Sequence, residues 1–244
     1  MTIYEMLSTA IAAEQPVAVA TVVGGLPSVG AKLLAQADGT TLGSLGVGLP
    51  AQEIVGDMLA MLTRAESGIR SYATPDGDVQ VFIETYPPSP TMFIVGAVHI
   101  AIPLVTFAKT LGFRAVVVDA RGAFATPERF AHADELIMAW PDEALAGKLN
   151  SNSFVVLLTH DPKLDDPALK IALPSPARYV GALGSPTTHA KRLVRLREDG
   201  VPEQQLTRLH APIGLKLGAN TPEEIAVSII AEVVAAQHGL TGKA

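Results

Sequence analysis

Apolar positions in the first third of the chain mark short elements separated by glycine- and proline-rich turns. Periodic apolar residues predict helices over 2–14 and 51–65. Runs of β-branched and other apolar residues, one pair of them around the turn signal Asp38-Gly39, predict strands over 17–23, 31–35, 40–44, 69–73 and 79–84. The segment Gly24–Gly30 between the first two strands is predicted as a loop. Together these elements indicate a small α+β domain over residues 1–86.

Prolines interrupt the pattern after this domain, in the sequence TYPPSP. Proline-rich segments are stiff and extended, so residues 87–90 are predicted to be a linker. A second domain is then expected over residues 91–244.

The second part of the chain alternates short apolar strands with helix-length segments. The predicted strands cover 92–95, 115–118, 136–139, 154–158 and 178–183. The helices that follow them are expected at about 100–111, 141–149, 165–173, 186–198 and 221–238. Such alternation is typical of a parallel sheet with helices on both faces. The sequence therefore predicts an α/β protein, a Rossmann-like doubly wound parallel sheet preceded by a small α+β domain.

The segment 91–119 has the order strand, glycine turn, helix, strand and acid that is typical of a dinucleotide-binding βαβ unit. In such a unit the turn at Gly96 faces a ligand phosphate, and the acid Asp119 can take a ribose hydroxyl. The G-x-G-x-x-G pattern is incomplete, because Val98 and Ala101 replace its second and third glycines. We expect Val98 to crowd a pyrophosphate bound in the usual way. The alternative is that Gly96 only makes a tight turn and Asp119 is only a solvated strand-end residue.

Polar and glycine residues follow four of the predicted strands. Because ligands of an open α/β sheet lie outside the carboxyl ends of its strands, these residues form one candidate cofactor site. Its members are Gly96, Ala97, Val98, His99, Asp119, Arg121, Thr159, His160, Asp161, Gly184 and Ser185. Gly184 and Ser185 begin a helix whose amides could hold an anion.

Each member also has a purely structural interpretation. His99, expected in the first helical turn, can be a capping or packing residue, and His160-Asp161 can be only a turn and a helix start. Arg192, two turns into the basic helix, is expected to be solvated. The histidine spacings do not indicate a metal site.

Composition narrows the function classes. The net charge of −6 argues against nucleic acid as a partner. The absence of cysteine excludes disulfides, thiolate metal sites and a persulfide carried by this chain. No apolar run reaches the length of a membrane span, and the first residues lack the basic region of a signal peptide, so a cytoplasmic location is expected.

Several sequence blocks closely resemble the xanthine dehydrogenase accessory family, XdhC/CoxI. They are GLPSVGAKLL, FIVGAVHIA, VVVDAR, LLTHD, YVGALGS and LHAPIGLKLGANTPEEIAVSIIAEVVA. The resemblance implies a maturation factor that binds the molybdenum cofactor, as molybdopterin or its dinucleotide form, and helps deliver it to an apo molybdenum hydroxylase. It implies an accessory protein rather than an enzyme, with sulfur supplied by a separate cysteine desulfurase and with a homodimer left open. Two departures from the family pattern are Val98 and Val47, which replace glycines.

Two other functions remain open at this point. The βαβ unit and Asp119 favour an NAD(P)-dependent oxidoreductase, which Val98 opposes. A third alternative is a ligand-free interaction subunit of the maturation machinery. The shared fold alone cannot choose among these functions.

Overall fold

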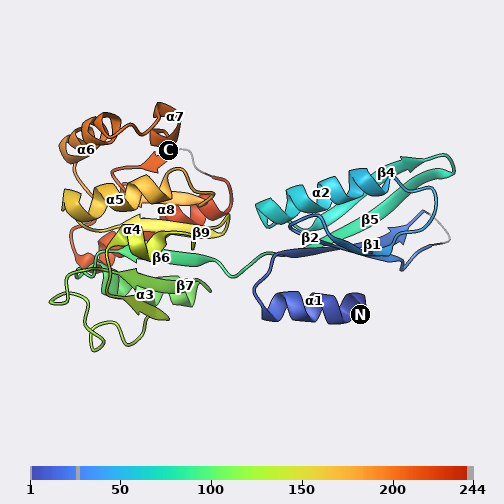
Figure 1. Cartoon of the computed structure of the whole chain (residues 1–244), viewed down its shortest axis with the longest axis horizontal. Coiled ribbons are helices and arrows are strands. Elements are labelled where there is room, and N and C mark those ends of the chain that lie inside the picture. Colours follow the sequence, from blue (N-terminus) through green and yellow to red (C-terminus); the bar gives the residue numbers. More distant parts are fainter. Residues whose placement is uncertain (1, 26–27, 241–244) are drawn as a thin grey trace. The chain divides into compact units, whose positions relative to one another are not determined.

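A computed structural model describes residues 2–25 and 28–240 of the chain (Figure 1). The chain divides into two compact units, residues 1–88 and 89–244. This division falls inside the segment 87–90, whose role as a linker stays a prediction. The predicted loop Gly24–Gly30 includes residues 26 and 27, which lie outside the described residues.

The first unit is a five-stranded antiparallel sheet of order β3-β2-β1-β5-β4, with α1 and α2 on opposite faces (Figure 1). Its elements are α1 (Ile3–Ala12), β1 (Val17–Gly24), β2 (Lys32–Gln36), β3 (Thr41–Ser44), α2 (Ala51–Arg64), β4 (Gly68–Thr74) and β5 (Gly77–Tyr86). Side chains alternate along a strand. Val17 and Val19 of β1 therefore pack under α1, while Ala18 and Ala20 pack under α2. The predicted α+β unit and its hairpin are confirmed.

The second unit is a six-stranded parallel sheet of order β11-β10-β9-β6-β7-β8. Its strands are β6 (Thr91–Val95), β7 (Arg114–Val118), β8 (Glu135–Ile137), β9 (Ser153–Leu157), β10 (Tyr179–Ala182) and β11 (Leu209–His210). Listed in space from β8 to β11, the strands are the third, second, first, fourth, fifth and sixth of this unit in chain order. This is the strand order of the dinucleotide-binding fold, so the predicted Rossmann-like sheet is confirmed.

Helices cover both faces of the parallel sheet (Figure 1). They are α3 (Ala101–Thr110), α4 (Pro141–Leu145), α5 (Pro162–Ala172), α6 (Pro186–Glu198), α7 (Glu203–Leu206) and α8 (Pro222–Gln237). Met92 and Ile94 of β6 face the core under α3 and α8, whereas Phe93 and Val95 face the core under α4 and α5. None of the helices in the described ranges is long and apolar enough to cross a membrane.

Several predicted helices and strands begin or end at other residues than expected. The helix expected from Asp165 begins at Pro162, because the Asp161 side chain caps it by accepting the Lys163 amide at 3.0 Å. The helix expected over 141–149 ends at Leu145, and the strand expected over 136–139 covers Glu135–Ile137. Both α7 and β11 were not predicted, since segments of four and two residues are too short to show a period.

A buried carboxylate ties α8 to the edge of the sheet. Glu232 of α8 accepts bonds from the Tyr179 hydroxyl and the Gly214 amide, both at 2.6 Å, and lies 3.2 Å from His210 Nδ1. Burial raises the pKa of Glu232, but the bonds from His210, Tyr179 and Gly214 outweigh it and the net pKa is lowered. Strands β10 and β11 and the loop after them therefore share one acceptor.

Candidate functional site

The strand order reverses at β6, which places β9 on one side of it and β7 on the other. In folds of this kind the ligand crevice lies outside the carboxyl ends of the strands at such a reversal. Val95, the last residue of β6, pairs with Val118 of β7 and Leu157 of β9. The segments that follow these three strands therefore start next to one another, and they contain most of the predicted site residues.

The turn after β6 needs a glycine. Gly96 has φ +108°, a conformation that favours glycine, and a Cβ there would lie 2.5 Å from Thr159 Cγ2. This close approach joins the loop after β6 to the loop after β9. Ala97 is fully buried, and its amide donates a 2.8 Å hydrogen bond to Asp119 Oδ2.

Asp119 is buried and holds its neighbours. Besides the Ala97 amide, its carboxylate accepts the Arg121 amide at 2.9 Å and the Arg121 guanidinium at 2.9 Å from Nε and 2.8 Å from Nη2. Burial raises the pKa of Asp119, but these bonds outweigh it and the net pKa is lowered. Asp119 is therefore charged at neutral pH and is bonded on both oxygens within the chain.

Arg121 presents the exposed part of this ion pair. One third of its side chain is accessible, and its guanidinium carbon lies 4.5 Å from the centre of the Phe124 ring. The hydrogen bonds that Arg121 donates to Asp119 raise the pKa of Arg121, with smaller contributions from the charges of Asp161 and Asp165. The planar guanidinium is thus fixed at the end of β7, charged and in contact with solvent.

His99 and Val98 lie in a turn before α3. The expected placement of His99 in the first helical turn is wrong, because α3 begins at Ala101. The amides of Ala101 and Ile102 bond to the carbonyls of Val98 and His99, so the chain coils once before the helix. His99 is exposed, whereas Val98 is partly buried and packs against the core under α3 and α8.

A buried ion pair lies beneath the loops after β9 and β10. Thr159, almost fully buried, donates to Asp165, and Asp165 accepts a 2.8 Å bond from Arg192. Arg192 also donates to the Leu183 carbonyl at 3.0 Å. Burial raises the pKa of Asp165, against the opposing bonds from Thr159 and Arg192. The network fixes the loops after β9 and β10 relative to each other.

Sequence reasoning missed both members of this ion pair. Arg192, expected to be solvated, is only 1% exposed, because its position on α6 faces α5 and the sheet. The available signal was its spacing, since Thr188, Arg192 and the buried Leu196 are four residues apart and share one helix face.

The remaining predicted residues lie at the same edge. His160 is exposed directly after Thr159, and Asp161 caps α5. Ser185 caps α6 by accepting the Thr188 amide at 3.1 Å, and Gly184 before it has φ +146°. Hydrogen bonds and close packing connect Gly96, Ala97, Asp119, Arg121 and Thr159. His99, His160 and Ser185 lie at the same edge, after β6, β9 and β10 respectively.

The accessible polar groups of the edge carry both donors and acceptors. Arg121, His99, His160 and Ser185 offer a guanidinium, two imidazoles and a hydroxyl, and the half-buried carboxylate of Asp161 lies close enough to act on Arg121. The exposed part of the Arg121 guanidinium is the group of this edge that suits an anionic ligand such as a phosphate ester.

Comparison with known proteins gives the family. Residues 92–233 match the model of the XdhC Rossmann domain, and residues 10–73 match that of the XdhC and CoxI family. Uncharacterized protein YqeB of Escherichia coli (strain K12) is 30% identical over 243 residues, 93% of this chain and 44% of its own.

Two further relatives carry functional names. A Bacillus subtilis (strain 168) protein named as a probable xanthine dehydrogenase subunit is 34% identical over 65% of this chain and 46% of its own. Molybdenum cofactor insertion chaperone PaoD of Escherichia coli (strain K12) is 35% identical over 36% of this chain and 28% of its own. The chain spans less than half the length of each of these curated relatives.

A solved structure supports the fold. A Bacillus halodurans protein named as a xanthine dehydrogenase superposes with a TM-score of 0.55 and 23% identity, covering 98% of this chain and 96% of its own. With both family models matched across most of its length, the chain belongs to the XdhC and CoxI family.

Proposed function

We propose that this protein binds the molybdenum cofactor and assists its insertion into a molybdenum hydroxylase. The names of two relatives, a molybdenum cofactor insertion chaperone and a probable xanthine dehydrogenase subunit, support this class of function. The observation that carries the proposal is the fixed, partly exposed guanidinium of Arg121 at the carboxyl ends of the strands.

The residues at this edge fit the cofactor. Molybdopterin and its dinucleotide form both carry phosphate, and Arg121, His99 and His160 are suited to hold it. Bound cofactor would supply the molybdenum that the target hydroxylase uses. In this scheme Gly96 allows the backbone to approach the cofactor closely, and Asp119 holds Arg121 and the Ala97 amide in place.

The same geometry weighs against an NAD(P)-dependent oxidoreductase. In that class a carboxylate at the end of the second strand receives a ribose hydroxyl. Asp119 accepts four hydrogen bonds from its own chain, so binding a ribose there would require breaking at least some of them.

The expected partners follow from the proposed role. An apo molybdenum hydroxylase would receive the cofactor. Because the chain contains no cysteine, any sulfur added to the molybdenum centre would come from a separate cysteine desulfurase. Self-association into a homodimer remains part of the proposal.

Co-purification tests this function. The chain, made in cells that synthesise the cofactor, should retain molybdenum measured by mass spectrometry and pterin measured by fluorescence after oxidation. Arg121→Gln and His160→Ala should each lower both by about tenfold or more, because each loses a charge-assisted bond. The matched control is His238→Ala, which removes an exposed histidine at the C-terminal end of α8.

Two results would refute the proposal. One is a wild-type chain that holds neither molybdenum nor pterin. The other is equal retention by Arg121→Gln, His160→Ala and the His238→Ala control, which would move the site away from this edge.

A further inference from the structure

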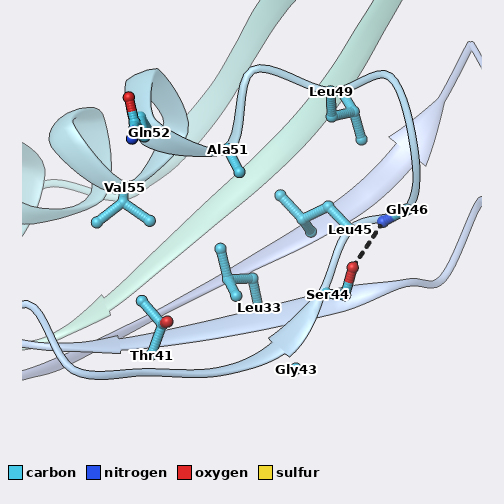
Figure 2. Close-up of a pocket in the computed structure, with 10 residues that line it drawn as sticks. All are labelled: Leu33, Thr41, Gly43, Ser44, Leu45, Gly46, Leu49, Ala51, Gln52 and Val55. Atoms are coloured by element: carbon cyan, nitrogen blue, oxygen red, sulfur yellow. Dashed lines mark hydrogen bonds between the residues drawn. The ribbon is translucent and has the colours of Figure 1, made fainter.

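The first unit contains a pocket that the proposed site does not use. It lies between β2, β3, the loop that follows β3 and the start of α2, and its volume is about 420 Å³ (Figure 2). Pockets for small molecules typically measure roughly 300–1,000 Å³. This cavity is therefore large enough for a ring system.

One part of the pocket wall is apolar. Leu33 and Leu45 are almost fully buried, and Leu49 and Val55 are half-buried against the core under α2. Figure 2 shows side chains from the strands facing those from α2 and the loop before it across the pocket. Two apolar surfaces that face each other favour a flat ligand that presents an apolar face to each.

The polar part of the wall is uncharged. Thr41, Ser44 and Gln52 contribute two hydroxyls and a carboxamide, and none of the described residues that line the pocket is charged. These groups can form hydrogen bonds with the polar edge of a ligand.

Close packing holds the end of β3 and the loop after it, which form one wall. A Cβ at Gly43 would lie 2.5 Å from the Lys32 carbonyl oxygen, and one at Gly46 would lie 3.2 Å from Ser28 Cβ. The Gly46 amide also donates to Ser44 Oγ at 3.2 Å, as Figure 2 shows. The pocket is thus preformed by contacts within the unit.

Val47 does not obstruct the pocket. Although it replaces a glycine expected in this loop, its side chain is fully exposed, and it is absent from the residues that line the cavity. Substitution of Val47 can therefore change the loop surface without changing the pocket volume.

We propose that this pocket binds a flat heterocycle of the pterin class. The volume, the facing apolar surfaces and the hydrogen-bonding groups of the rim fit a planar ring with polar edges. The choice of a pterin among such rings rests on the proposed function.

Fluorescence titration with 6-hydroxymethylpterin, which lacks phosphate, tests the assignment. The wild-type chain should change the probe fluorescence saturably. Val55→Phe places a ring inside the cavity, and Gln52→Phe places a ring at its exposed rim one helical turn away, where it leaves the core intact. Both variants should bind the probe at least tenfold more weakly, whereas the control Val47→Phe should bind it as the wild type does.

Probe affinities of Val55→Phe and Gln52→Phe within twofold of wild type would overturn the assignment, as would a wild-type chain that never changes the probe fluorescence. The probe also separates this inference from the proposed function. Binding of the probe in the pocket by a chain that retains no molybdenum cofactor supports the pocket and refutes the proposed function. If cofactor retention depends on Arg121 while Val55→Phe leaves probe binding unchanged, the pocket assignment alone is refuted.

Discussion

Replacing Asp119 by asparagine should destabilise the second unit, whatever ligand the protein binds. The buried carboxylate accepts the amides of Ala97 and Arg121 and two bonds from the Arg121 guanidinium. Asparagine keeps the shape but has one acceptor oxygen, and its amide group turns a donor toward other donors. At least one of the four bonds to position 119 is lost.

The size of the effect follows from burial. The Ala97 amide lies in a fully buried residue, and a buried donor without a partner costs about 1–3 kcal/mol. Arg121 is one-third exposed and can be rehydrated, so loss of the ion pair adds only about 1 kcal/mol. We expect a total of about 3 kcal/mol, which lowers Tm by roughly 6–12 °C for a unit of this size.

Tryptophan fluorescence reports on the affected unit alone, because Trp140, the single tryptophan, lies there as the residue before α4. Thermal and urea unfolding of Asp119→Asn at pH 7 should show the loss. Glu198→Gln, which removes one exposed negative charge from the same unit, should stay near the wild type. A change of less than about 0.5 kcal/mol for Asp119→Asn would refute the assignment of Asp119 as a positioning residue.

Three other perturbations have defined outcomes. Arg192→Met should cost about 3–5 kcal/mol in urea unfolding because Asp165 is left buried and unpaired, and Asp165→Asn in the same chain should recover part of it; no recovery would contradict the buried pair. Gly96→Ala should lower Tm because its Cβ would meet Thr159 at 2.5 Å in a strained backbone, and an unchanged Tm would contradict that contact. The lowered pKa of Asp119 adds stability that is present above its unfolded pKa near 3.8 and is lost as pH falls through the folded value. Acid unfolding followed by Trp140 fluorescence should therefore begin below about pH 4. This part of the acid dependence should vanish in Asp119→Asn.

The fold was predictable because its signals are local. Strands β6 and β7 are short apolar runs that are almost wholly buried, and glycines bracket the helix between them. Thr221 with Glu224 forms a capping box at the start of α8, and these two residues are only three positions apart. These features depend on neighbours within a few residues, which a single sequence displays.

The chemistry of the edge was less predictable because its partners are distant in the chain. The bond from the Ala97 amide to Asp119 spans 22 residues, and the pair Asp165–Arg192 spans 27. A strand-end acid gives the same sequence signal whether it faces a ligand or its own backbone. Only the folded structure distinguishes these cases, and in it Asp119 holds the turn.

Glu232 has a consequence for biosynthesis. It is the shared acceptor for Tyr179, His210 and Gly214, all of which precede it in the chain. Until α8 has emerged from the ribosome, Tyr179 of β10 and His210 of β11 lack the carboxylate to which they bond. The part of the sheet that carries Gly184 can therefore reach its final form only after α8 has emerged, so a nascent chain completes this side of the edge late in its synthesis.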